Sequence, residues 1–209
     1  VKRGEKVAFV GRNGEGKSTL VKCILNEIPY TGTLKIGHNV QIGYFAQNQA
    51  QMLDNSLTVF NTIDSVARVD VRLRINDILG AFMFGGEASE KKVSVLSGGE
   101  KSRLAMIRLL LEPVNLLILD EPFDGLDVAS RRQLADHLAT LHEAGYTLVL
   151  VLNRFDDIPE FVPFAGVLAD CTLTETGATK ALLAQTLIAQ LAHSEKLSGM
   201  TLPEPDAPS

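Results

Sequence analysis

The residues with the clearest chemistry lie in a glycine-rich loop near the start of the chain. Residues 11–18 read Gly-Arg-Asn-Gly-Glu-Gly-Lys-Ser and fit the pattern G-x-x-x-x-G-K-[ST]. The backbone N–H groups of such a loop, with the N-terminus of a following helix, surround a phosphate with positive potential. The pattern therefore predicts a nucleoside triphosphate site, with a glycine-rich turn as the alternative. Lys17 would reach the β- and γ-phosphates, and the Ser18 hydroxyl would bind Mg²⁺. The predicted phosphate-binding residues are Gly11, Asn13, Gly14, Gly16, Lys17, Ser18 and Thr19.

Two adjacent carboxylates form a second candidate group. Asp120 and Glu121 directly follow an apolar run at 116–119, which is typical of a buried strand in a parallel sheet. Ligands of such folds bind at the carboxyl ends of the strands. Asp120 would hold Mg²⁺, and Glu121 would polarise a water molecule that attacks the γ-phosphate. The alternative is a polar strand end followed by a helix cap.

A third group, Leu-Ser-Gly-Gly-Glu at 96–100, precedes a predicted helix. Ser97, Gly98 and Gly99 would offer a hydroxyl and bare N–H groups at a helix N-terminus, which is again a setting for anion binding. Taken alone, Ser-Gly-Gly is a common turn. Because the chain already has one phosphate cradle, a second one predicts that a single ATP is held between two chains.

The elements that must position these groups alternate between strands and helices, which predicts an α/β fold with a mostly parallel sheet flanked by helices. Residues 48–111 lack strong strand patterns and are predicted to form a helical lobe, with the core lobe at 1–47 and 112–200 and a disordered tail at 201–209. The predicted strands are 6–10, 33–36, 40–45, 116–119, 147–152 and a pair within 165–176. The predicted helices are 17–26, a helical stretch at 56–84, 99–111, 128–143 and 178–195.

Composition limits the classes of function. The chain has 209 residues, is 45% hydrophobic and carries a formal net charge of −5, so broad nucleic-acid binding and DNA sequence reading are not expected. No apolar run is long enough to cross a membrane. Two cysteines, Cys23 and Cys171, suggest a reducing compartment, and we expect a cytoplasmic protein. The basic residues Lys91, Lys92, Lys101 and Arg103 are predicted to form a solvated face, since no aromatic side chains are interleaved with them.

With the three motifs together, the chain resembles the nucleotide-binding domain of an ABC-type ATPase, a P-loop NTPase. The resemblance implies that residues 96–100 are the signature motif, which contacts the γ-phosphate bound by the other domain. Gln47, in Tyr-Phe-Ala-Gln, matches the Q-loop glutamine that senses Mg²⁺ and the attacking water. Asp127, in Gly-Leu-Asp, matches the D-loop aspartate that couples the two sites, and it can also cap a helix.

Different parts of the chain resemble two different groups within this family. Residues 1–118 are similar to the second ATPase half of the ABC-F translation factors. Residues 116–209 are similar instead to the bacterial molybdate-transport-associated twin ATPases, also called photorepair proteins. We therefore expect a chimera joined where the two patterns meet, with a divergent single lineage as the alternative.

The chain departs from the family pattern at two points. Asn153 stands where the family has a switch histidine after the 147–152 strand. An amide can donate a hydrogen bond to the γ-phosphate but cannot titrate, so we expect slower hydrolysis with nucleotide binding largely kept. The resemblance places the family's first strands and its adenine-stacking aromatic upstream of the glycine-rich loop, and we expect this chain to lack them and to have a weaker preference for adenine.

These features predict an ATP-binding and ATP-hydrolysing domain that works as a homodimer or pairs with another ABC ATPase half. One alternative is an ATP-gated binding module with little turnover that contacts a ribosome or a transporter. Another is a recombined domain without a native process.

Overall fold

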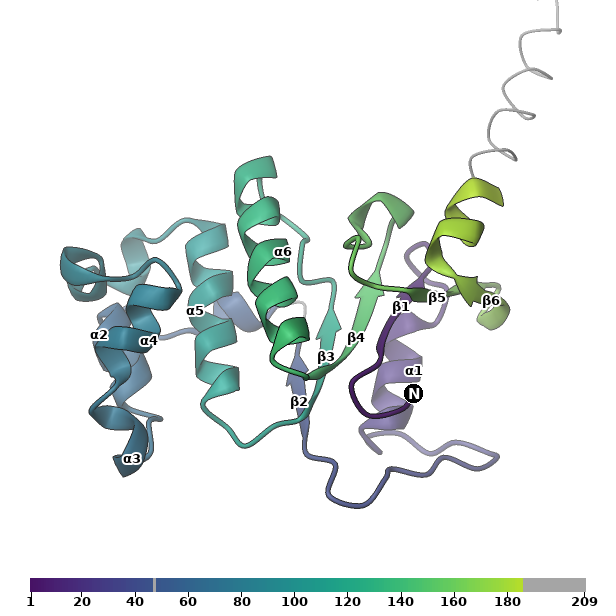
Figure 1. Ribbon diagram of the computed structural model, residues 1–209, viewed down its shortest axis with the longest axis horizontal. Coiled ribbons are helices and arrows are strands. Elements are labelled where there is room, and N and C mark those ends of the chain that lie inside the picture. Colours follow the sequence, from purple (N-terminus) through teal and green to yellow (C-terminus); the bar gives the residue numbers. More distant parts are fainter. Residues whose placement is uncertain (47, 186–209) are drawn as a thin grey trace, which may run out of the picture.

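The computed structural model describes residues 1–46 and 48–185, and within them six strands form one sheet in the order β2-β3-β4-β1-β5-β6 (Figure 1). All neighbouring pairs are parallel except β5 and β6, which pair in antiparallel fashion. The predicted α/β fold with a mostly parallel sheet is confirmed. The strands are β1 (Lys6–Val10), β2 (Ile42–Phe45), β3 (Leu116–Asp120), β4 (Thr147–Leu152), β5 (Phe164–Ala169) and β6 (Thr172–Ala178).

The centre of the sheet is buried because helices cover both of its faces. Every residue of β4 is buried, as expected for a parallel strand that reads Thr-Leu-Val-Leu-Val-Leu. Successive side chains point to opposite faces, so Ile118 and Val149 pack with Val21 of α1 (Lys17–Ile24). Their sequence neighbours on the other face join the cluster that holds Leu134 and Leu138 of α6 (Val128–Glu143). Figure 1 shows α6 in front of the sheet and α1 behind it.

Register brings the ends of three strands to one edge of the sheet. Val10 pairs with Leu152, and Asp120 pairs with Val151. The residues that follow β1, β3 and β4 therefore meet at the same carboxyl edge, although they are far apart in sequence.

Residues 48–111 are helical and contain no strand in the part that the structure describes, apart from an isolated bridge between Thr58 and Lys92. The expected helical stretch at 56–84 is broken into short helices: the first ends at Asp64, and the extended backbone of Arg68 caps the next one. The helices are α2 (Val59–Asp64), α3 (Val69–Arg72), α4 (Ile75–Ala81) and α5 (Gly98–Leu110). They form the left end of the molecule in Figure 1. Their assignment to a separate lobe stays a prediction.

Two other local predictions differ from the structure. Residues 33–36 form no strand, because this segment is largely exposed to solvent and pairs with no neighbour. The helix expected over 178–195 begins at residue 179 and is described as far as 185. The predicted tail at 201–209 lies outside the described residues. Within the described ranges, no helix has the length and apolar character required to span a membrane.

Candidate nucleotide site

The glycine-rich loop joins β1 to the N-terminus of α1, as the sequence predicted. Gly16 is the N-cap of α1 and has φ +81°, a conformation that favours glycine. A Cβ atom at Gly11 would lie 2.5 Å from the carbonyl oxygen of Leu168 in β5, so the loop can leave β1 here only with glycine. Asn13 and Thr19 are exposed along the same loop and first helical turn, where they can meet a ligand.

Lys17 is buried beneath this loop, with a relative exposure of 4%. Its Nζ donates to the carbonyl oxygens of Gly11 at 2.9 Å and Arg12 at 3.1 Å. It also donates to Asn153 Oδ1 at 2.7 Å and lies 3.5 Å from Glu121 Oε1. These contacts hold the ammonium group between the loop and the ends of β3 and β4.

Ser18 and Asp120 meet across the carboxyl edge of the sheet. Ser18 Oγ donates to Asp120 Oδ2 at 3.2 Å, and the Tyr44 hydroxyl donates to the same oxygen at 3.1 Å. The other carboxylate oxygen, Oδ1, is buried and has no hydrogen-bond partner in the described structure. A carboxylate oxygen left free beside a hydroxyl fits a divalent cation of the Mg²⁺ type.

No group of three or more His, Cys, Asp or Glu side chains that could hold a metal occurs among the described residues. A Mg²⁺ ion at Ser18 and Asp120 would therefore depend on oxygen ligands from a nucleotide, as is usual for this ion. Tyr44 was not predicted as a site residue. Burial and the neighbouring charge of Asp120 raise the pKa of the Tyr44 hydroxyl far above its ordinary value, so this group stays a neutral donor.

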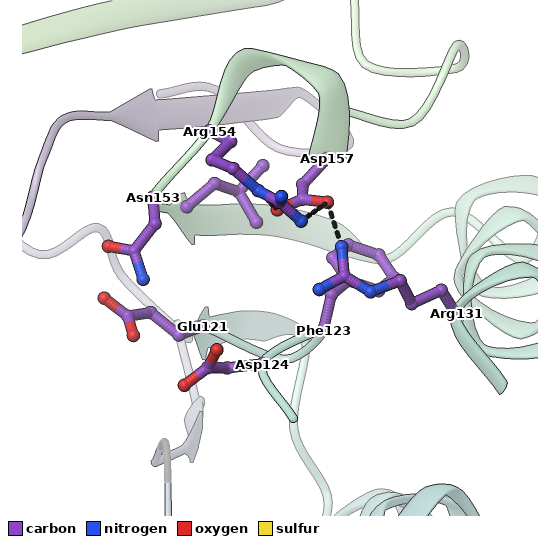
Figure 2. A pocket seen from close by; sticks show the side chains of 8 residues that line it. Glu121, Phe123, Asp124, Arg131, Asn153, Arg154 and Asp157 are labelled. Atoms are coloured by element: carbon purple, nitrogen blue, oxygen red, sulfur yellow. Dashed lines mark hydrogen bonds and ion pairs between the residues drawn. The ribbon is translucent and has the colours of Figure 1, made fainter. Parts of the chain in front are cut away.

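Glu121 adopts φ +50°, which is uncommon for a residue with a side chain. Its N–H donates to the Val151 carbonyl at 2.8 Å, and its side chain is only 9% exposed. Strained backbone of this kind is often found at functional sites. Glu121 and Asn153 face one another across a pocket of about 310 Å³ (Figure 2). The other residues that line it are Phe123, Asp124, Arg131, Leu152, Arg154 and Asp157.

The structure thus brings together the predicted residues Lys17, Ser18, Asp120, Glu121 and Asn153. Gln47 lies outside the described residues.

The predicted signature residues lie elsewhere in the chain. Ser97 caps α5 through a capping box, in which its Oγ accepts from the Glu100 N–H and its own N–H donates to the Glu100 carboxylate. Ser97 and Gly98 are exposed, whereas Gly99 is buried. In Figure 1, β3 and β4 lie between α5 and the β1–α1 pair.

Gly99 is buried because α5 and α6 touch at this point. A Cβ atom on Gly99 would lie 2.2 Å from Ser130 Oγ and 2.5 Å from Ser130 Cβ. Asp127 caps α6 by accepting from the Ser130 N–H at 2.9 Å, as the sequence predicted. These hydrogen bonds hold the pKa of Asp127 below its ordinary value. The sequence suggested no link between Gly99 and Ser130.

Arg103 does not belong to a solvated face, which corrects the prediction for that residue. It is 8% exposed, lies over the Phe84 ring and donates to Gln133 Oε1 at 2.6 Å. Burial lowers the pKa of its guanidinium. Arg103 therefore joins α5 to α6, while Lys91 and Lys92 are exposed as expected.

Comparison with known protein families gives a match to the "ABC transporter" family over residues 1–124. The ABC transporter ATP-binding protein ModF of Escherichia coli is 46% identical over 221 residues, covering 99% of this chain and 45% of the relative. ABC transporter F family member 2 of Arabidopsis thaliana is 41% identical over 79% of this chain and 26% of the relative. The chain therefore spans less than half the length of these curated relatives.

Two solved structures have a similar fold. One is a metal-chelate type ABC transporter in an inward-facing conformation, with a TM-score of 0.74, 20% identity, and coverage of 88% of this chain and 75% of that one. The other is a dimeric ATP-binding cassette in a post-hydrolysis state bound to ADP and phosphate. Its TM-score is 0.67 at 21% identity, with coverage of 86% and 87%.

Proposed function

Because this chain belongs to the ABC transporter family of ATPase domains, we propose that it binds and hydrolyses ATP as one half of an ATP-sandwiched dimer. The observation that carries the proposal is the convergence of Lys17, Asp120 and Glu121 at one edge of the sheet. Lys17 lies 3.5 Å from Glu121, and Ser18 donates to Asp120. A cation, a metal-binding pair and a general base are the groups that phosphoryl transfer to water requires.

Each residue has a separate task in this proposal. The loop N–H groups and Lys17 bind the phosphates, with Asn13 and Thr19 adding hydrogen bonds. Ser18 and Asp120 hold Mg²⁺, which neutralises charge on the phosphates when it is bound. Glu121 orients the attacking water, and Asn153 donates its amide N–H to the γ-phosphate while its oxygen accepts from Lys17. Gln47, which follows β2 by two residues in the sequence, is proposed to contact Mg²⁺ and the water.

The signature residues are proposed to act on the nucleotide of a second chain. Two features support this: Ser97 and Gly98 are exposed, and α5 lies on the far side of β3 and β4 from the loop at 11–18. Two-fold pairing would place Ser97, Gly98 and the Gly99 N–H of each chain over the phosphates of the other. Asp127 would lie at the same interface. The second chain is either another copy or a different ABC ATPase half.

We further propose that residues 1–47 and 112–200 form a core lobe and residues 48–111 a helical signature lobe. A chimera of the two groups of relatives would have its junction near 116–118. The match of ModF to 99% of the chain at 46% identity supports the single-lineage alternative instead.

An ATP-gated binding module with little turnover is the second candidate. The neutral Asn153 at the position of the switch histidine favours it, since an amide cannot carry charge toward the γ-phosphate. A ribosome or a transporter would be the partner whose contact is controlled.

Mg·ATP hydrolysis measured as a function of protein concentration tests the proposal, with Glu121→Gln as the blank. A rate per molecule that rises with concentration, disappears in the variant and requires Mg²⁺ is the expected result. ATP binding without turnover above the blank would favour the binding module. Absence of ATP binding to the wild-type chain would contradict both.

A further inference from the structure

An ion-pair cluster lines the same pocket as Glu121 and Asn153, and the proposed function gives it no role in nucleotide binding. Asp157, 14% exposed, accepts from Arg131 Nη1 and from Arg154 Nε, the latter at 3.3 Å (Figure 2). Asp157 ends the short helical turn Phe155–Asp157 that follows Asn153, so it is tied by a few residues of chain to the partner of Lys17.

Arg131 connects this cluster to the turn that precedes α6. Its Nε donates to the Leu126 carbonyl at 3.1 Å while Nη1 reaches Asp157. One guanidinium therefore bridges the backbone of residues 124–127 and the turn after β4. A planar fork with several N–H groups can make both contacts at once, which a lysine cannot do in the same geometry.

The turn at 124–127 also packs against α5, the helix that begins with the signature residues. Asp127 binds Ser130, and Ser130 fills the space beside Gly99 so closely that a Cβ atom there would overlap it. Lys17 is thus linked to the start of α5 by the Asn153 hydrogen bond, the short chain segment 153–157, the Asp157–Arg131 pair and the packing of Ser130 on Gly99.

We infer that Asp157 is a positioning residue that fixes the 124–127 turn and the adjoining signature helix relative to Asn153, so that the phosphate end of the site and the surface offered to a second chain move together. This inference rests on the proposed function for its catalytic consequence, but the positional link is a property of the chain itself. Arg154 is the weaker partner, because its side chain is 59% exposed and its contacts are 3.3 and 3.5 Å long. The Arg131 contact carries the link.

Amide hydrogen exchange on the full chain without nucleotide tests the link directly. Asp157→Asn should speed exchange in peptides that cover 121–127 by about tenfold, because the turn loses its anchor to the loop after β4. Arg154→Gln is the matched control and should leave these peptides within about twofold of wild type, since it does not touch the turn. Arg131→Lys keeps the charge but not the forked guanidinium, and it should speed exchange in the same peptides as Asp157→Asn does. It replaces Asp157→Asn in the test if that variant does not fold.

Steady-state kinetics test the consequence for catalysis. Asp157→Asn should lower kcat about fivefold with the KM for ATP within about twofold, and Asp157→Glu should recover part of the loss. The double variant Asp157→Asn/Arg131→Lys should be no worse than either single variant. Asp70→Asn, in an exposed pair with Arg68, controls for loss of an acid elsewhere.

Failure of the Asp157 link and failure of the proposed function give different results. Unchanged exchange at 121–127 in Asp157→Asn and Arg131→Lys overturns the link, whether or not the chain hydrolyses ATP. If exchange is faster in the variants but the wild-type chain does not hydrolyse ATP, the link is supported and the proposed hydrolysis is contradicted. Faster exchange with unchanged kcat in an active enzyme overturns the positioning role.

Discussion

Asn153 Oδ1 accepts a hydrogen bond from Lys17 Nζ at 2.7 Å, which joins the end of β4 to the buried lysine of the phosphate-binding loop. The two residues are 136 positions apart in the chain. The contact places a neutral amide beside the ammonium group, where the family that this chain resembles has a histidine.

Replacing this amide tests its effect on turnover. Asn153→His should raise kcat about tenfold or more, because an imidazole can share a proton near neutral pH whereas an amide cannot. ATP affinity, measured by calorimetry, should stay within about twofold, since most phosphate contacts are proposed to come from the loop. Asn153→Ala, which removes the acceptor of Lys17, is the control and should not raise kcat. Turnover of the histidine variant equal to wild type would contradict the prediction.

The contact between α5 and α6 leaves no room for a side chain at Gly99. Gly99→Ala should lower the free energy of unfolding by about 1–3 kcal/mol, because its Cβ atom would overlap Ser130. Gly98→Ala is the matched control, since its Cβ atom would meet nothing closer than the Gly125 carbonyl at 3.9 Å. Denaturant unfolding measures both, and the Gly99→Ala/Ser130→Gly pair should recover part of the loss. Equal stability of Gly98→Ala and Gly99→Ala would show that the helices separate without cost.

Tyr44 orients the carboxylate that is proposed to hold Mg²⁺. Tyr44→Phe removes the donor to Asp120 Oδ2 and should raise the Mg²⁺ concentration for half-maximal ATP hydrolysis about tenfold. The raised pKa of the hydroxyl keeps it protonated. The change in Mg²⁺ requirement should therefore be the same at all pH values from 6 to 9, the upper limit being about one unit below the ordinary tyrosine pKa. Tyr30→Phe, at a residue 39% exposed, is the control. An unchanged Mg²⁺ requirement in Tyr44→Phe would rule out this role.

The cap of α6 gives a pH-dependent prediction. The pKa of Asp127 is lowered in the folded chain, so its charge stabilises the fold above the unfolded pKa, and this stabilisation is lost as pH falls through the folded value. Asp127→Asn keeps the capping geometry but not the charge. Its Tm should therefore be below that of wild type at pH 7, and the difference should shrink below about pH 4. A difference in Tm that is constant with pH would mean that the charge has no part in it.

The sequence correctly predicts those helices, strands and loops of this chain that depend on residues close together in sequence. The helix at 128–143 with its Asp127 cap, the strand at 147–152 and the loop at 11–18 all occur where the pattern predicts them. Each depends on hydrogen bonds or periodic burial within a few residues. The wrong predictions, a strand at 33–36 and an exposed Arg103, concern segments whose state is decided by neighbours elsewhere in the chain.

The functional groups of the candidate site can be read from the sequence alone, because the loop at 11–18 and the Asp-Glu pair at 120–121 carry them in fixed local spacing. Which groups contact one another follows from the packed fold: Tyr44 with Asp120, Lys17 with Asn153, and Arg131 with Asp157. Those contacts depend on strand order, register and the approach of α6 to the sheet. Periodicity along the chain specifies which face of an element is buried, but not which element it meets, so long-range pairing is settled only when the sheet and its helices pack.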